Sequence, residues 1–294
     1  MPKNLAIVYV KLMGMAFFWG GTFIAGRVIA RDVGPFAAAF LRFLVASAFL
    51  FVLLLKEEGK LPPVTRAQVL PLILLGSTGV FAYNVFFFKG LKLIEAGRAA
   101  IIIANNPILI ALCSAILFKE RLTPKKMIGV MLSVSGAVLA ISRGNPLTLL
   151  QGGLGWGELF IGACVLSWVT FSLIGKTVMS GLSPLTSITY ASVIGAAALF
   201  VPACYDGLLQ GITQYGWTAW VGVFYLGFFG TVLGFVWYYE GIRAIGPTRA
   251  GLFINFVPIS AIILAFIILK EPLTVSLLGG AVLVSTGVYL TNTG

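Results

Sequence analysis

The chain has 294 residues, of which 59% are hydrophobic and only 10% are charged. A soluble domain carries roughly 25% charged residues, so this composition excludes an ordinary water-soluble fold and indicates a lipid bilayer as the partner that surrounds the chain. The net charge of +11 does not predict a nucleic-acid partner, because the basic residues stand singly between apolar runs.

Apolar runs long enough to cross a membrane follow one another along the chain. In order, they cover residues 11–30, 35–55, 69–89, 97–118, 124–142, 156–178, 184–205, 217–240, 248–269 and 273–292. No segment alternates as the strand of a membrane barrel does, and only a helix satisfies every backbone amide within its own segment. The sequence therefore predicts an all-α membrane protein with ten transmembrane helices.

The second half of the chain repeats the first. Equivalent residues include Trp19 and Trp168, Pro35 and Pro184, Gly90 and Gly241, Pro107 and Pro258, and Gly136 and Gly287. Apolar bias alone would not match Pro, Trp and Gly. Five spans per half is an odd number, so the second copy enters the membrane in the opposite orientation. We expect two inverted five-helix repeats, residues 1–143 and 144–294, an arrangement typical of alternating-access transporters with a substrate site near the midplane.

The segments that end the fourth and ninth spans carry a family resemblance. They run from Asn106-Pro107 to Thr123 and from Val257-Pro258 to Thr274. Together with the ten-helix plan, they resemble the EamA branch of the drug/metabolite transporter superfamily, which includes YddG-like aromatic amino acid exporters. The resemblance implies a secondary transporter that exports amino acids or related small amphiphilic metabolites across a bacterial-type inner (plasma) membrane. Drug or cation efflux by the same fold is the alternative.

Lys and Arg outside the spans are more frequent on the side of the two termini than on the other side. This bias predicts that both termini are cytoplasmic. The chain has no histidine and no paired cysteines, which excludes His-ligated metal sites and Ser-His-Asp hydrolases. We expect no metal, no cofactor and no enzymatic activity; the alternative from another class is a membrane-embedded lipid-modifying enzyme, which would lack the usual catalytic clusters.

Prolines and amides mark one group of candidate residues. Pro107 and Pro258 lie near the centres of the fourth and ninth spans, where each removes a backbone hydrogen bond and forms either a hinge or a static kink. Asn105, Asn106 and Asn255 lie beside them. An amide at this depth is not expected to face lipid, so each contacts either substrate or a neighbouring helix.

Aromatic residues mark a second group. Trp19 and Trp168 occupy equivalent mid-span positions, and Thr22 and Phe171 follow on the same helix faces. They form either a cavity wall for an amphiphilic ligand or ordinary packing. Further candidates for substrate binding are Tyr83 and Asn84 in the third span, and Trp237 and Tyr238 in the eighth.

Charged and small residues complete the sequence-based expectations. Basic residues are nearly absent from mid-span positions, Arg42 being one that lies within a span, so no phosphate clamp is expected. Glu240 is either a gate or coupling group or an interfacial carboxylate, and both proton exchange and facilitated diffusion stay open. Small residues on the fifth and tenth spans mark close packing or a dimer seam, so the chain is a monomer or a homodimer.

Overall fold

The computed structural model describes residues 5–118, 123–147, 154–178 and 182–293. All regular secondary structure in these ranges is helical, and ten helical segments are long and apolar enough to cross a membrane. The ten predicted spans are thereby confirmed. Several helices extend beyond the apolar runs, and the first begins at Leu5 rather than near residue 11.

The first five spans contain eight helical elements, which we call the first half. They are α1 (Leu5–Asp32), α2 (Pro35–Glu58), α3 (Arg66–Leu75), η1 (Gly76–Ala82), α4 (Tyr83–Leu93), α5 (Ala96–Ile103), α6 (Asn106–Phe118) and α7 (Pro124–Ile141). The third span comprises α3, η1 and α4, and the fourth comprises α5 and α6.

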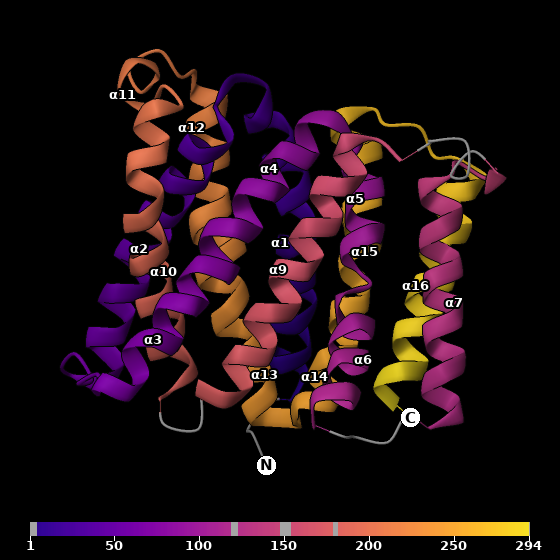
Figure 1. The fold of residues 1–294 in the computed structure, drawn as a ribbon, viewed down its shortest axis with the longest axis horizontal. Helices are drawn as coiled ribbons and strands as arrows, with labels where there is room; N and C mark the ends of the chain where they lie inside the picture. Colours follow the sequence, from indigo (N-terminus) through magenta and orange to yellow (C-terminus); the bar gives the residue numbers. More distant parts are fainter. Residues whose placement is uncertain (1–4, 119–122, 148–153, 179–181, 294) are drawn as a thin grey trace.

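The remaining elements form the second half. They are α9 (Trp156–Val178), α10 (Pro184–Tyr205), α11 (Leu208–Gly211), α12 (Trp217–Phe224), η2 (Tyr225–Leu233), α13 (Gly234–Ile245), α14 (Pro247–Leu252), η3 (Phe253–Asn255), α15 (Phe256–Leu264), η4 (Ala265–Leu269) and α16 (Val275–Thr293). Both chain ends lie at the same end of the bundle, which we call the lower end (Figure 1).

The two halves pack on each other in a reciprocal pattern. α4 of the first half packs on α9 of the second, and α13 of the second packs on α1 of the first. Equivalent spans also pair directly, with α2 on α10 at one edge of the bundle and α7 on α16 at the other (Figure 1). This exchange of roles is what a two-fold relation between inverted halves predicts.

Prolines and polar capping residues define the first residues of several helices. α2, α7 and α10 each begin with proline, whose fixed φ suits the first helical turn. The side chains of Thr123 and Ser183 accept hydrogen bonds from Lys126 N at 3.2 Å and Thr186 N at 3.1 Å. Each cap satisfies an amide that the helix itself leaves free, so the span begins at a defined residue.

Glycines let α7 and α16 approach each other closely. A Cβ built on Gly287 would lie 2.4 Å from the Gly129 carbonyl oxygen, and one on Gly136 would lie 2.7 Å from the Gly280 carbonyl oxygen. Dispersion contacts between closely approaching backbones hold membrane helices together where no hydrophobic effect operates between them. The small residues of the fifth and tenth spans therefore pack on each other within one chain, rather than leaving that face open as a dimer seam.

Four spans depart from regular α-helix. The fourth is interrupted between Ile103 and Asn106, and the ninth passes through the 3₁₀ turn η3, in each case just before the proline at residue 107 or 258. The third and eighth spans contain the π-helical segments η1 and η2 near their middles, and the ninth ends in a third, η4. The proline breaks follow from the missing N–H and the clash one turn earlier, whereas the π segments are not predicted from the sequence.

We expect Gly287→Ala to lower thermal stability, because its new methyl group meets backbone that cannot move aside. Overpacking of this kind costs about 1–3 kcal/mol. The matched control is Gly162→Ala in α9, where a Cβ meets nothing within 4 Å. The melting temperature in detergent measures both; equal melting temperatures for the two variants would contradict the close α7–α16 contact.

Candidate functional site

A small internal cavity lies between the two halves. Its volume is about 30 Å³, enough for a water molecule or two. The lining residues of the first half are Arg42, Phe43, Gly79, Val80, Tyr83 and Asn84, and those of the second half are Trp168, Phe171, Ile188 and Phe235. The cavity thus takes one wall from each half.

Arg42 provides the charge of this cavity. It lies about a third of the way along α2 and is only 8% exposed. Its Nη1 donates to Asn84 Oδ1 at 2.9 Å, while Nε and Nη2 donate to Thr231 Oγ1 at 3.3 and 3.2 Å. Asn84 belongs to the first half and Thr231 to the second, so one guanidinium joins the two halves.

The two π segments orient the partners of Arg42. Asn84 is the second residue after η1, and its Nδ2 donates to the carbonyls of Gly79 at 3.3 Å and Val80 at 2.9 Å. Thr231 lies within η2, and its hydroxyl donates to the Leu226 carbonyl at 2.9 Å. With their donors used in this way, both side chains present an oxygen to the guanidinium.

No acidic side chain among the described residues forms an ion pair with Arg42. An arginine at the centre of a membrane helix costs about 2.5–3.5 kcal/mol on insertion scales, so such residues face the interior of the bundle and mark functional sites. The sequence already shows Arg42 inside an apolar run, which is the signal that could have identified it. From the sequence, Arg42 is a basic residue within a span with no assigned role; the structure shows that it lines the cavity.

Aromatic rings form most of the remaining wall. The Trp168 ring centroid lies 5.2 Å from those of Tyr83 and Phe171, and 6.5 Å from that of Phe235. Phe171 packs directly on Gly79, where any Cβ would lie 2.3 Å from the ring. Tyr83, Asn84, Trp168 and Phe171, all candidates from the sequence, therefore meet in one place.

The remaining aromatic candidates lie away from the cavity. The Trp19 indole donates to the Gly230 carbonyl at 3.0 Å, and Thr22 donates to the Trp19 carbonyl at 2.6 Å. The Tyr238 ring packs at a tilt against Trp19, with centroids 5.6 Å apart, and Trp237 packs near Phe18. These residues build the contact between α1 and the eighth span. Phe235 lies between Trp19 and Trp168, so the two equivalent tryptophans do not share one wall.

The amide candidates have separate surroundings. Asn105 donates to the Ile101 carbonyl at 3.0 Å and accepts from Ser133 Oγ of α7 at 2.8 Å, which is a helix–helix contact. Asn106 Oδ1 is buried with no hydrogen-bond partner among the described residues. Asn255 is half-buried at the end of η3. Neither these three nor Pro107 and Pro258 line the cavity.

A buried ion pair joins the halves at the upper end, opposite the termini. Arg98 of α5 donates to Glu158 of α9 at 2.8 Å, with both side chains 7% exposed, and lies 3.5 Å from Glu95. Glu271 of the second half caps α5, accepting from the backbone N–H groups of Ala96 and Gly97 at 2.9 and 3.1 Å.

A second carboxylate strengthens this closure of the upper end. Asp206, which follows α10, accepts from the backbone N–H of Phe36 at 2.8 Å and caps α2. Anions are favoured at helix N-termini by the helix dipole and the free amides. Two helices of the first half are therefore capped from the second.

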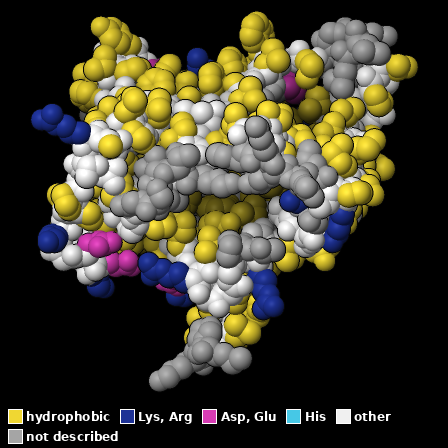
Figure 2. Space-filling view, turned by 60° about the horizontal axis from the view of Figure 1, so that its bottom comes forward, with side chains coloured by type: hydrophobic (Ala, Val, Ile, Leu, Met, Phe, Trp, Pro, Cys, Tyr) yellow, Lys and Arg dark blue, Asp and Glu magenta, His cyan; other side chains and the backbone are white. Residues whose placement is uncertain are grey.

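The lower end is held less tightly. Lys11 of α1 and Glu240 of α13 pair at 2.5 Å, but their side chains are 35% and 46% exposed. Glu240 is therefore paired with Lys11 at the end of its span. Figure 2 shows a hollow with a hydrophobic floor in the middle of this face. The ion pairs at the two ends of the molecule therefore differ in burial.

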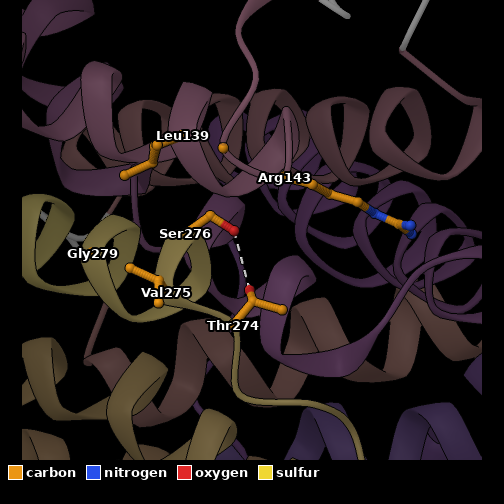
Figure 3. A pocket seen from close by; sticks show the side chains of 7 residues that line it. Leu139, Arg143, Thr274, Val275, Ser276 and Gly279 are labelled. Carbon is orange, nitrogen blue, oxygen red and sulfur yellow. Dashed lines mark hydrogen bonds between the residues drawn. The ribbon is translucent and has the colours of Figure 1, made fainter.

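A larger depression of about 490 Å³ lies at the upper edge, between α7 and α16. Thr274 and Ser276 hydroxyls meet there at 3.1 Å, and Thr274 also caps α16 by accepting from Leu277 N (Figure 3). Arg143 points away from both hydroxyls in this view. Because its polar groups do not converge, we regard the central cavity as the candidate site.

The described structure has ten candidate spans in two halves that pack on each other reciprocally, and Arg42 and aromatic rings line a cavity between the halves. This arrangement defines an integral membrane protein of the transporter class. The family model described as the EamA-like transporter family matches residues 6–142 and 155–293, and the chain belongs to this family. One solved crystal structure has the same fold, with a TM-score of 0.64 at 20% identity, covering 98% of this chain and 96% of the other.

Curated relatives agree with the class. The chain is 31% identical to "Uncharacterized transporter YyaM" of Bacillus subtilis, over 96% of this chain and 92% of the relative. It is 29% identical to "Probable terminal-alkyne amino-acid exporter" of Streptantibioticus cattleyicolor, over 93% and 89%. It is 24% identical to "Uncharacterized inner membrane transporter YedA" of Escherichia coli, over 89% and 83%. The family and these names indicate a transporter.

We expect Arg98→Met to destabilise the protein by about 3–5 kcal/mol, because Glu158 would be left buried without its cation. Replacing both partners with methionine should recover much of this loss. Lys11→Met at the exposed pair should cost no more than about 1 kcal/mol. Denaturant unfolding in detergent gives these values; equal losses for Arg98→Met and Lys11→Met would show that burial does not distinguish the two pairs.

Proposed function

We propose that this chain is a secondary transporter that exports amino acids or related small amphiphilic metabolites by alternating access. The observation that carries the proposal is the cavity walled by both halves, because only a site shared by two moving parts can change its exposure as they move. Aromatic rings and hydrogen-bonding groups lie side by side in it. Such a lining matches a molecule with a polar head and an apolar body.

The difference between the two ends supports alternating access. A buried ion pair and two helix caps join the halves at the upper end, whereas the ion pair at the lower end is exposed and a hollow is seen on that face. We infer that this conformation is closed above and more open below. Transport then requires the Arg98–Glu158 contact to separate and the halves to close at the lower end, with the breaks before Pro107 and Pro258 absorbing the change.

The relatives favour the substrate class without defining it. The amino-acid exporter of Streptantibioticus cattleyicolor is similar over nearly the whole chain. The aromatic lining is compatible with the YddG-like preference, which stays a prediction. Drug or cation efflux is the second candidate, and the buried Arg42 opposes it, because a cationic ligand would meet a like charge in the same small cavity.

We propose that the lower end faces the cytoplasm, so that closure above corresponds to an inward-facing carrier. Single cysteines replacing Lys11 and Arg143, in a chain whose three native cysteines are replaced, should label on opposite sides of the membrane. The Lys11 site should react with an impermeant maleimide only in inverted vesicles. Labelling of both sites from one side would contradict the inverted arrangement.

Purified protein in liposomes should exchange labelled amino acids with an excess of the same compound inside. Trp168→Ala should lower this counterflow at least tenfold, because it removes the ring that contacts Tyr83, Phe171 and Phe235 around the cavity. The matched control is Trp217→Ala, which removes an 81% exposed tryptophan at a span end and should leave counterflow unchanged.

Counterflow is measured at equal amounts of reconstituted protein. Exchange of cationic dyes without exchange of any amino acid in a full panel would replace this proposal with drug efflux. An equal loss of counterflow in the Trp168→Ala and Trp217→Ala variants would show that transport does not depend on the central cavity.

A further inference from the structure

We propose that Arg42 binds the carboxylate of the transported compound, so that the cavity selects amphiphiles with a carboxylate head and an apolar body. This inference rests on the proposed transport function and specifies its substrate class. Arg42 is a cation buried inside a membrane span, it lines the cavity, and its described partners are the neutral oxygens of Asn84 and Thr231 and the Phe43 ring, 5.4 Å away, none of which carries a negative charge. These three facts together define an anion site whose anion comes from outside the chain.

The hydrogen-bond count of the guanidinium leaves room for this anion. An arginine has five N–H donors in a planar fork. Three of its N–H groups bond to Asn84 and Thr231, one from each of the three nitrogens. One N–H therefore remains on Nη1 and one on Nη2. Two N–H groups on neighbouring nitrogens are the donor set that a carboxylate accepts in bidentate fashion.

The guanidinium is held before any ligand arrives. Asn84 and Thr231 are themselves fixed by hydrogen bonds to carbonyls of the π segments, at 2.9 Å to Val80 and 2.9 Å to Leu226. A cation oriented in advance loses little conformational entropy when it binds, which increases the affinity that its charge can provide. π-helical turns recur at functional sites in helices, and here one lies on each side of the same charge.

The rest of the lining favours an apolar body over a second charged group. Trp168, Phe171 and Phe235 offer ring surfaces, and no acidic residue lines the cavity within the described parts of the chain. An α-ammonium group would find ring faces, which attract cations only modestly. The carboxylate is therefore the dominant recognition element. A phosphate ester usually meets more than one cation, whereas a single arginine suits a single negative charge.

Ligand binding at Arg42 would also act on the contact between the halves. Thr231 of the second half accepts two of the three hydrogen bonds that Arg42 makes. The cavity of about 30 Å³ is too small for an amino acid, so the walls must separate before one can enter. A carboxylate forms stronger bonds to arginine than a neutral hydroxyl does, so a ligand on the two free N–H groups can hold Arg42 while the halves rearrange and its bonds to Thr231 break.

A set of three probes with one apolar body tests the proposal by binding alone. Phenylacetate, phenylacetamide and phenethylamine differ only in carrying a carboxylate, a neutral amide or an ammonium group. We expect the wild-type protein in detergent to bind phenylacetate at least about tenfold more tightly than phenylacetamide, and to bind phenethylamine least, as measured by equilibrium binding and by the rise in melting temperature.

Variants assign the preference to one residue. Arg42→Gln should abolish the preference for phenylacetate, and Arg42→Lys should restore part of it, since lysine keeps the charge but not the planar fork. Arg66→Gln, which removes an exposed arginine at the start of α3, should keep the full preference. If Arg42→Gln does not fold, the comparison of probes on the wild-type protein still decides the question.

Three results would overturn the proposal: no binding of phenylacetate, equal affinity for phenylacetate and phenylacetamide, or a preference that survives in folded Arg42→Gln. Inorganic phosphate that competes as strongly as phenylacetate would also reject carboxylate selection. These outcomes are independent of amino-acid counterflow. Carboxylate-selective binding without counterflow would contradict the transport function and support the carboxylate site. Counterflow without a preference for phenylacetate would support the transport function and contradict the carboxylate site.

Discussion

Inside a bilayer, polar groups have no water to bond to, so each must find its partners within the protein. This constraint explains where the polar residues of the chain lie. Arg42 reaches Asn84 and Thr231, and Asn105 reaches Ser133. Some helix N-termini of one half are capped by side chains of the other half. The Glu271 carboxylate, for example, accepts from the backbone N–H of Ala96 at the start of α5. Arg42 and Glu271 thereby place polar side chains at the contact between the halves.

The contact between the two halves differs between the edges and the centre of the bundle. At the two edges, equivalent helices pair closely, and glycines at the α7–α16 contact bring the backbones within contact distance. In the centre, the third, fourth, eighth and ninth spans are interrupted by π-helical, 3₁₀ or broken turns. Regular helices at the edges and interrupted ones in the centre suit a protein whose central helices move within a stable frame.

Features that depend on local composition could be predicted from the sequence. Ten spans, the repeated halves and the four cavity residues Tyr83, Asn84, Trp168 and Phe171 follow from apolar runs and matched positions. Equivalent positions do not guarantee equivalent surroundings, however, and Trp19 lies behind Phe235 whereas Trp168 lines the cavity. The π segments were beyond prediction, because one extra residue in a turn rotates everything after it by about 100°. The face of α4 and of α13 that points inward cannot then be counted from the start of the span.

Arg42, the arginine that lines the cavity, has a consequence for how substrate binding can differ between the two sides of the membrane. Pro35 and Pro184 are equivalent, which makes Ala191 the counterpart of Arg42, and Ala191 is fully buried and carries no charge. A carrier built from two identical halves would offer the same binding groups to both compartments. Here the backbone is nearly two-fold but the chemistry is not. A bound molecule keeps one fixed polarity relative to the membrane normal, so the intrinsic affinities met from the two sides need not be equal.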